Sequence, residues 1–198
     1  MPDNERPTVL VIDDEQAIAD LYADWLSVEY EVRTVYDGRE ALDALDDSVA
    51  VILLDRRMPG LSGDEVLAEV RRRGFDTRVA MVTAVSPDFD VVAMGFDDYL
   101  VKPVSGEELL DTVERLLLLS EYDDELQTYY SLATKRALLE TEQPREFLGG
   151  NEEYEELCQE VTVARQRLDD LGTDLDASDF DSLFRGLDGT DEENSATS

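Results

Sequence analysis

The stretch Val49-Ala-Val-Ile-Leu-Leu-Asp55 is an apolar run of six residues that ends on a carboxylate. A run without polar alternation is typical of a strand that is buried on both faces, as strands are in a parallel sheet. Four further short runs have a strand-like composition and lie at residues 8–12, 30–35, 78–82 and 99–101. The sequence therefore predicts five strands, which form the framework of an α/β fold.

Segments in which apolar residues recur every three or four positions alternate with the predicted strands. These predicted helices lie at residues 15–28, 38–46, 63–73, 87–95 and 105–119. Strands that alternate with helices through right-handed crossovers form a (βα)5 fold, which is a doubly wound parallel five-stranded sheet. We expect functional groups to gather at the carboxyl ends of its strands.

Beyond residue 120 the strand pattern disappears, and apolar residues recur at helical spacing. A break at 143–150 separates this helix from a second one, which Asn151 can cap and which runs to about Leu171. A short third helix is predicted at 177–187, behind an Asp-rich turn. We therefore expect an α/β domain over residues 1–120, a small all-α hairpin domain over 121–187 and a disordered acidic tail over 188–198.

The chain carries 49 acidic and 17 basic side chains, which give a formal net charge of −32 at pH 7. Residues 1–120 hold 27 acidic and 11 basic groups and residues 121–198 hold 22 and 6, so each part contributes −16. Only two basic residues are lysines, a pattern that resembles the proteomes of organisms that accumulate molar salt. The ordinary alternative is a solvated acidic surface in a low-salt cell. Because so negative a surface repels phosphates, we expect no direct DNA binding by either part.

Composition excludes several classes of function. The chain has no histidine and a single cysteine, Cys158, so it forms no Cys/His zinc site, no internal disulfide and no histidine-based catalytic centre. No apolar run approaches the roughly 18 to 20 residues of a membrane span. The first residues also lack the order of a signal peptide. We therefore expect a cytoplasmic protein that makes no membrane contact.

Chemistry-bearing side chains follow four of the five predicted strands. In strand order they are Asp13 and Asp14, Asp55, Thr83 and Lys102. Carboxylates that meet at one sheet edge repel one another, so they favour a hard cation such as Mg²⁺, which takes oxygen ligands. Asp55 is the candidate nucleophile because a carboxylate can accept a phosphoryl group, with Thr83 and Lys102 holding its oxygens. Each acidic residue alone is as well explained by a helix cap or a solvated turn, but the whole set is not.

Three segments resemble motifs of the receiver domain of two-component response regulators, the CheY-like family with a flavodoxin-like fold. They are Val9-Leu-Val-Ile-Asp-Asp-Glu15, Asp55-Arg-Arg-Met-Pro-Gly-Leu-Ser-Gly63 and Asp97-Asp-Tyr-Leu-Val-Lys-Pro103. The resemblance implies that Asp55 is the phosphoacceptor and that a sensor histidine kinase is the phosphodonor. It also implies that Mg²⁺ is held by Asp14, Asp55, the backbone carbonyl of Arg57 and, through water, Asp13.

The same resemblance implies roles for residues at the other strand ends. Thr83 and Lys102 would sense the phosphoryl group, and Tyr99 would be a switch aromatic that turns inward. The Lys102–Pro103 peptide bond would be cis, which the energetics of X–Pro bonds permit. The chain would then be a signalling protein and not a classical enzyme, because its receiver only assists phosphotransfer to Asp55 and the later loss of the phosphoryl group.

An α/β domain followed by a small acidic helical domain resembles the haloarchaeal response regulators that carry a C-terminal HalX domain. The C-terminal helices carry no glycine-rich phosphate loop, no catalytic constellation and no basic recognition helix, so we expect an interaction module. Its expected partner is an unknown protein target, and a homodimer is the other expectation. We also hypothesise that the helix at 105–119 runs directly into residues 121–142. Dimerisation of the receiver would then be transmitted along one rod.

Three alternatives stay open on the sequence alone. One is a scaffold that acts without phosphorylation, and another is a transcriptional regulator whose C-terminal part contacts DNA at high salt. The third is an aspartate-nucleophile phosphatase, which would carry Asp-x-Asp after its first strand. Here Asp13 and Asp14 are adjacent, and the chain leaves no room for a substrate-covering domain.

Overall fold

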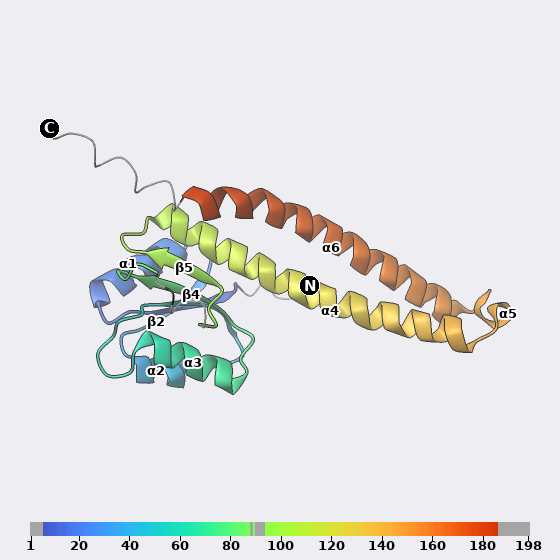
Figure 1. Ribbon diagram of the computed structural model, residues 1–198, viewed down its shortest axis with the longest axis horizontal. Helices are drawn as coiled ribbons and strands as arrows, with labels where there is room; N and C mark the ends of the chain where they lie inside the picture. The colour runs from blue at the N-terminus through green and yellow to red at the C-terminus, as the bar shows by residue number, and fades with distance from the viewer. Residues whose placement is uncertain (1–5, 88, 90–93, 186–198) are drawn as a thin grey trace. The chain divides into compact units, whose positions relative to one another are not determined.

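The structure is a computed structural model that describes residues 6–87, 89 and 94–185. The chain divides into two compact units, Met1–Leu117 and Leu118–Ser198. The first unit is an α/β domain and the second is helical (Figure 1).

The first unit is built on one parallel sheet of five strands. The strands are β1 (Thr8–Ile12), β2 (Glu31–Val35), β3 (Val49–Leu54), β4 (Arg78–Thr83) and β5 (Asp98–Val101). Their order across the sheet is β2-β1-β3-β4-β5, and each neighbouring pair is parallel. This is the doubly wound order of flavodoxin-like folds, so the predicted fold class is confirmed.

Helices cover both faces of this sheet. They are α1 (Gln16–Leu26), α2 (Gly38–Ala44), α3 (Gly63–Arg73) and the beginning of α4 (Gly106–Glu142). Figure 1 shows α2 and α3 together on one face and α1 with the first turns of α4 on the other. The helix predicted at 87–95 falls largely on residues 88 and 90–93, which lie outside the described residues.

Burial explains why these segments form their elements. All five residues of β1 are buried, and β3 is buried at every position except Ala50. The third helix begins with a capping box in which Ser62 and Glu65 satisfy each other's backbone N–H groups. It ends at Gly74, whose φ of 75° is the left-handed conformation typical of a helix C-cap. Strong end signals are why its predicted bounds agree with the structure.

The second unit contains the rest of α4, the short α5 (Arg145–Leu148) and the long α6 (Glu152–Arg185). Helix α4 is unbroken from Gly106 to Glu142, so the hypothesis that the helix at 105–119 runs directly into residues 121–142 is confirmed at the level of secondary structure. The boundary between the two units falls inside this helix. Asn151 caps α6 as predicted, because its side chain accepts a hydrogen bond from the Tyr154 N–H at 2.9 Å.

The prediction of a separate third helix behind an Asp-rich turn is wrong, since α6 continues to Arg185. The stretch contains no proline, and one internal glycine, Gly172, costs a helix only about 1 kcal/mol. Buried apolar side chains at Val161, Ala164, Leu168 and Leu175 keep the helical spacing through this stretch. The predicted disordered tail lies outside the described residues.

Candidate metal and phosphoryl site at the strand ends

Three carboxylates meet where β1 and β3 end side by side. Asp13 and Asp55 are the residues that follow these strands, and the Asp55 N–H donates to the Ile12 carbonyl at 2.8 Å. One carboxylate oxygen from each of Asp13, Asp14 and Asp55 lies within 4.8 Å of the other two. Asp13 and Asp55 are buried, with 2% and 6% exposure, while Asp14 is half-buried. The predicted convergence of acidic side chains is therefore present.

Lys102 brings one ammonium group to these carboxylates. Its backbone N–H donates to the Thr83 carbonyl at 2.9 Å, which fixes the start of its side chain beside β4. Its Nζ donates to Asp13 Oδ2 at 2.6 Å and lies 3.4 Å from Asp55 Oδ1. One cation thus faces two buried anions, which leaves the cluster with excess negative charge.

The pKa values of this pair reflect burial and attraction. Burial raises the pKa of the Asp13 carboxyl, although its hydrogen bonds from Lys102 and from the Glu15 N–H act against the increase. Burial alone would lower the pKa of the Lys102 ammonium. Its hydrogen bond to Asp13 and the attraction of Asp55 outweigh this effect, so the pKa lies above its usual value. The lysine therefore stays charged beside the carboxylates.

Thr83 and Tyr99 are linked through Val85. The buried Thr83 hydroxyl accepts a hydrogen bond from the Val85 N–H at 3.4 Å. The Tyr99 hydroxyl donates to the Val85 carbonyl at 2.7 Å, and its ring packs against Phe96 with centroids 5.4 Å apart. The Lys102–Pro103 peptide bond is cis. A displacement of Thr83 would therefore reach Tyr99 through a single residue.

The loop after β3 forms one wall of the site. The Arg57 N–H donates to Asp55 Oδ2 at 3.1 Å, so the backbone holds the carboxylate in place. A cavity of about 440 Å³ opens at the strand ends. Its lining residues are Asp14, Glu15, Asp55, Arg57, Thr83, Ala84, Val85 and Lys102. The structure therefore brings Asp14, Asp55, Arg57, Thr83 and Lys102 to one hollow, with Asp13 bonded to the lysine beside it.

Two glycines of this loop, Gly60 and Gly63, have different roles. Gly60 has a φ of 80° with nothing within 4 Å of an added Cβ, whereas Gly63 would place a Cβ against the Asp55 carbonyl and 2.9 Å from the Arg56 Cα.

We expect Gly63→Ala to lower the free energy of unfolding by about 2 kcal/mol through overpacking. Gly60→Ala should cost about 1 kcal/mol, because it only strains the backbone. Urea denaturation of both variants measures the two losses of unfolding free energy. Equal losses in Gly63→Ala and Gly60→Ala would contradict the prediction.

Sequence reasoning assigned no role to two features of the site. The first is Val85, which bridges Thr83 and Tyr99 through its backbone N–H and carbonyl. Asp97 accepts hydrogen bonds from Arg71 Nη2 at 2.6 Å, Arg78 Nη1 at 2.9 Å and the Val79 N–H at 2.8 Å. It thereby fixes the entry to β5, from which Tyr99 and Lys102 follow. No spacing rule predicts these contacts, because the partners come from different elements.

A parallel sheet in flavodoxin-like order with a carboxylate cluster and a lysine at its strand ends defines the receiver class of signalling domain. Comparison with known families agrees: residues 9–114 match the response regulator receiver domain, and residues 118–184 match the HalX domain. The chain belongs to the response regulator receiver family and carries a C-terminal HalX domain. The two resemblances noted from the sequence are thus confirmed.

Named relatives match about two thirds of this chain. A candidate transcriptional regulator of Haloferax volcanii is 52% identical over 134 residues, which cover 67% of this chain and 23% of that protein. The transcriptional regulatory protein CpxR of Escherichia coli strain K12 is 35% identical over 60% of this chain and 53% of its own length. The chain therefore spans about a quarter to a half of the length of these relatives.

Solved structures match slightly more than half of this chain. A CheY-like receiver domain protein of Methanospirillum hungatei is 26% identical with a TM-score of 0.57, covering 60% of this chain and 99% of that one. The response regulator TrrA of Thermotoga maritima, in complex with Mg²⁺ and beryllofluoride, is 36% identical with a TM-score of 0.50. That match covers 56% of this chain and 98% of TrrA. Within the described part of the chain, no helix combines the length and apolarity needed to cross a bilayer.

Proposed function

We propose that this response regulator accepts a phosphoryl group on Asp55 from a sensor histidine kinase, with Mg²⁺, and changes conformation as a result. The observation that carries the proposal is the position of Asp55, which lies at a cavity with Lys102 Nζ 3.4 Å from one of its oxygens. In the transfer, the bond from phosphorus to the kinase histidine nitrogen breaks and a bond to an Asp55 oxygen forms. Lys102 then has an anionic oxygen to bind in addition to Asp13.

The donor set fits a magnesium ion. Three carboxylates offer oxygen ligands within 4.8 Å of one another, and only one ammonium group contacts them among the described residues. Hard oxygen ligands of this kind are what Mg²⁺ takes. We assign the direct ligands to Asp14, Asp55 and the Arg57 backbone carbonyl, with Asp13 acting through water. The ion would offset the negative charge of an incoming phosphoryl group.

The switch would begin at Thr83. Its hydroxyl currently accepts from the Val85 N–H, and a phosphoryl oxygen on Asp55 would offer it an acceptor to which it can donate. Movement of Thr83 would displace Val85, whose carbonyl holds the Tyr99 hydroxyl. Loss of that hydrogen bond would free the aromatic ring to turn. The link through Val85 supports Tyr99 as the switch residue.

The C-terminal helices would carry the output. Their charge of −16 favours a protein partner, either a second copy or another protein in the cytoplasm, over DNA. Two named relatives are described as regulators of transcription, which supports gene control as a second candidate output. Retention of the full chain on promoter DNA in molar KCl would favour this second candidate.

Beryllofluoride, a phosphoryl mimic, tests the proposal on the full chain in molar KCl. We expect saturable binding that requires Mg²⁺ and changes the fluorescence of Trp25. A small-molecule phosphodonor should also add one phosphoryl group to the intact mass, and peptide mapping should place it on Asp55. A folded chain that neither binds the mimic nor gains this mass would identify the scaffold alternative as correct.

A further inference from the structure

Between Gln127 and Thr141, one face of α4 carries exposed side chains and no charge, and it begins four residues after the exposed Asp123. Its two large apolar members are Tyr130, which is 63% exposed, and Leu138, which is 61% exposed. Four smaller or uncharged polar residues, all exposed, continue the face between and beyond them. Intervals of three and four residues place these side chains on one side of the helix. We call this face the α4 stripe, and it consists of Gln127, Tyr130, Thr134, Ala137, Leu138 and Thr141.

The α4 stripe points away from α6. The face of α4 that meets α6 is marked by Glu125, which lies 3.6 Å from Arg167, and by Glu140, which accepts from the Tyr154 hydroxyl at 2.9 Å. Tyr130 is five residues beyond Glu125, so it lies roughly 140° around the helix from that contact. The helical hairpin therefore buries one face of α4 and leaves the α4 stripe in solvent.

We propose that the α4 stripe binds the same stripe of a second copy of this chain, antiparallel and centred on Thr134. Tyr130 precedes Thr134 by four residues and Leu138 follows it by four, so a two-fold axis at Thr134 places Tyr130 against Leu138 of the partner subunit. At the axis, the short Thr134 side chain lets the helices approach, and its hydroxyl can hydrogen-bond to that of the partner's Thr134. Two hairpins joined in this way form a four-helix bundle, which buries more apolar surface than one hairpin.

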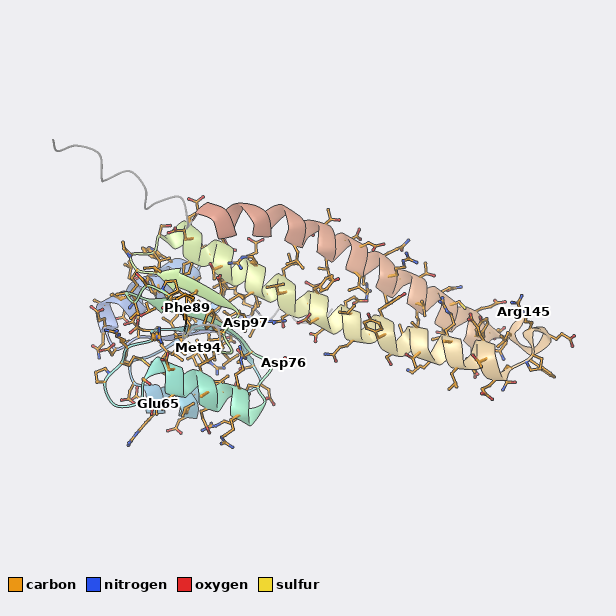
Figure 2. The ribbon with its side chains drawn as sticks, in the orientation of Figure 1. Glu65, Asp76, Phe89, Met94, Asp97 and Arg145 are labelled. Atoms are coloured by element: carbon orange, nitrogen blue, oxygen red, sulfur yellow. The ribbon has the colours of Figure 1, made fainter. Side chains whose placement is uncertain are left out.

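The distribution of charge permits this occupant and favours this direction. One residue in three of the chain is charged, yet the α4 stripe has none, so two copies meet there without opposing their acidic surfaces. An acidic stretch at 121–125 precedes the stripe, and Arg145 follows it at the turn between α4 and α6 (Figure 2). Parallel pairing would set the two acidic stretches side by side. Antiparallel pairing separates the two stretches by roughly 33 Å along the helix. Each one then lies near Arg145 of the partner subunit, which is flanked by Glu142 and Glu146, so the facing segment carries fewer negative charges than a second acidic stretch would.

Light scattering of the full chain in molar KCl tests this interface. We expect a dimer without phosphorylation, and Leu138→Glu should raise its dissociation constant about 30-fold or more. Val163→Glu is the matched control, because Val163 is a 45% exposed apolar residue on α6 outside the stripe. Val163→Glu should leave the dimer intact. Circular dichroism of both variants should show the helicity of the wild type, which establishes that both are folded.

Cross-linking tests the position of the axis. In a Cys158→Ser background, Thr134→Cys should form a disulfide-linked dimer under oxidation, and Val163→Cys should not. Antiparallel pairing further requires that a mixture of Tyr130→Cys and Leu138→Cys chains links more than either chain alone. A monomeric wild type, or a dimer that Leu138→Glu leaves unchanged, would overturn the proposal. Neither result affects beryllofluoride binding, so the proposal of this interface and the proposal of the phosphoryl site are tested independently.

Discussion

Asp55→Asn is expected to abolish phosphoryl incorporation while the protein stays folded. The amide has nearly the same shape as the carboxylate, and its oxygen can still accept the hydrogen bond that the Arg57 N–H donates to Asp55. It lacks an anionic oxygen to attack phosphorus, so transfer should fall by at least about 1000-fold. The change also removes the repulsion that Asp55 exerts on Asp13. We therefore expect the free energy of unfolding to be unchanged or slightly higher.

Intact mass after incubation with Mg²⁺ and a small-molecule phosphodonor measures this effect. Asp46→Asn is the matched control, because it makes the same chemical change at an exposed carboxylate that pairs with Arg33 and lies outside the cluster. Asp46→Asn should gain a phosphoryl group as the wild type does. Full incorporation in Asp55→Asn would mean that a different carboxylate is the acceptor.

Lys102→Met is expected to lower the free energy of unfolding by about 3 kcal/mol in the absence of divalent cations. The side chain of Lys102 is 11% exposed and those of Asp13 and Asp55 are 3% and 8% exposed, so the two anions would lose their cation in a buried place. Methionine fills a similar volume without charge, which limits the loss to the electrostatic part. Because Mg²⁺ would replace the missing cation, it should restore much of the stability. The variant should therefore depend on Mg²⁺ more steeply than the wild type does.

Urea denaturation with and without Mg²⁺ measures both effects. Lys135→Met is the natural control, since Lys135 is the only other lysine and lies exposed on α4. It should change stability by less than about 0.5 kcal/mol. Adding Asp13→Asn to Lys102→Met should recover part of the loss, because it removes one of the stranded charges. Equal stability of the two lysine variants would show that the cluster does not need its ammonium group.

The strand ends were predictable because a parallel sheet leaves little freedom there. Polar residues come directly after four of the five predicted strands, and parallel strands place those residues at one edge of the sheet. This was enough to bring Asp13, Asp14 and Asp55 together and to place Lys102 beside them. It required no knowledge of loop conformation.

Other features were not predictable from spacing. The hydrogen bond between Tyr99 and Val85 depends on how the end of β4 turns, and the steric role of Gly63 depends on how closely α3 approaches the loop after β3. The sequence predicts too short a second hairpin helix, because an Asp-rich stretch favours a turn locally. Packing of its apolar side chains outweighs that local preference, and a sequence pattern does not report tertiary packing.

The fluorescence of the single tryptophan, Trp25, can report on the start of α4. Trp25 on α1 lies against Gly106, the first residue of α4, where an added Cβ would come 3.1 Å from the indole ring. Any displacement of the first turn of α4 would change the solvent and the dipoles around the indole, and with them its emission. The native protein thus contains a dye-free optical probe at the point where its longest helix begins.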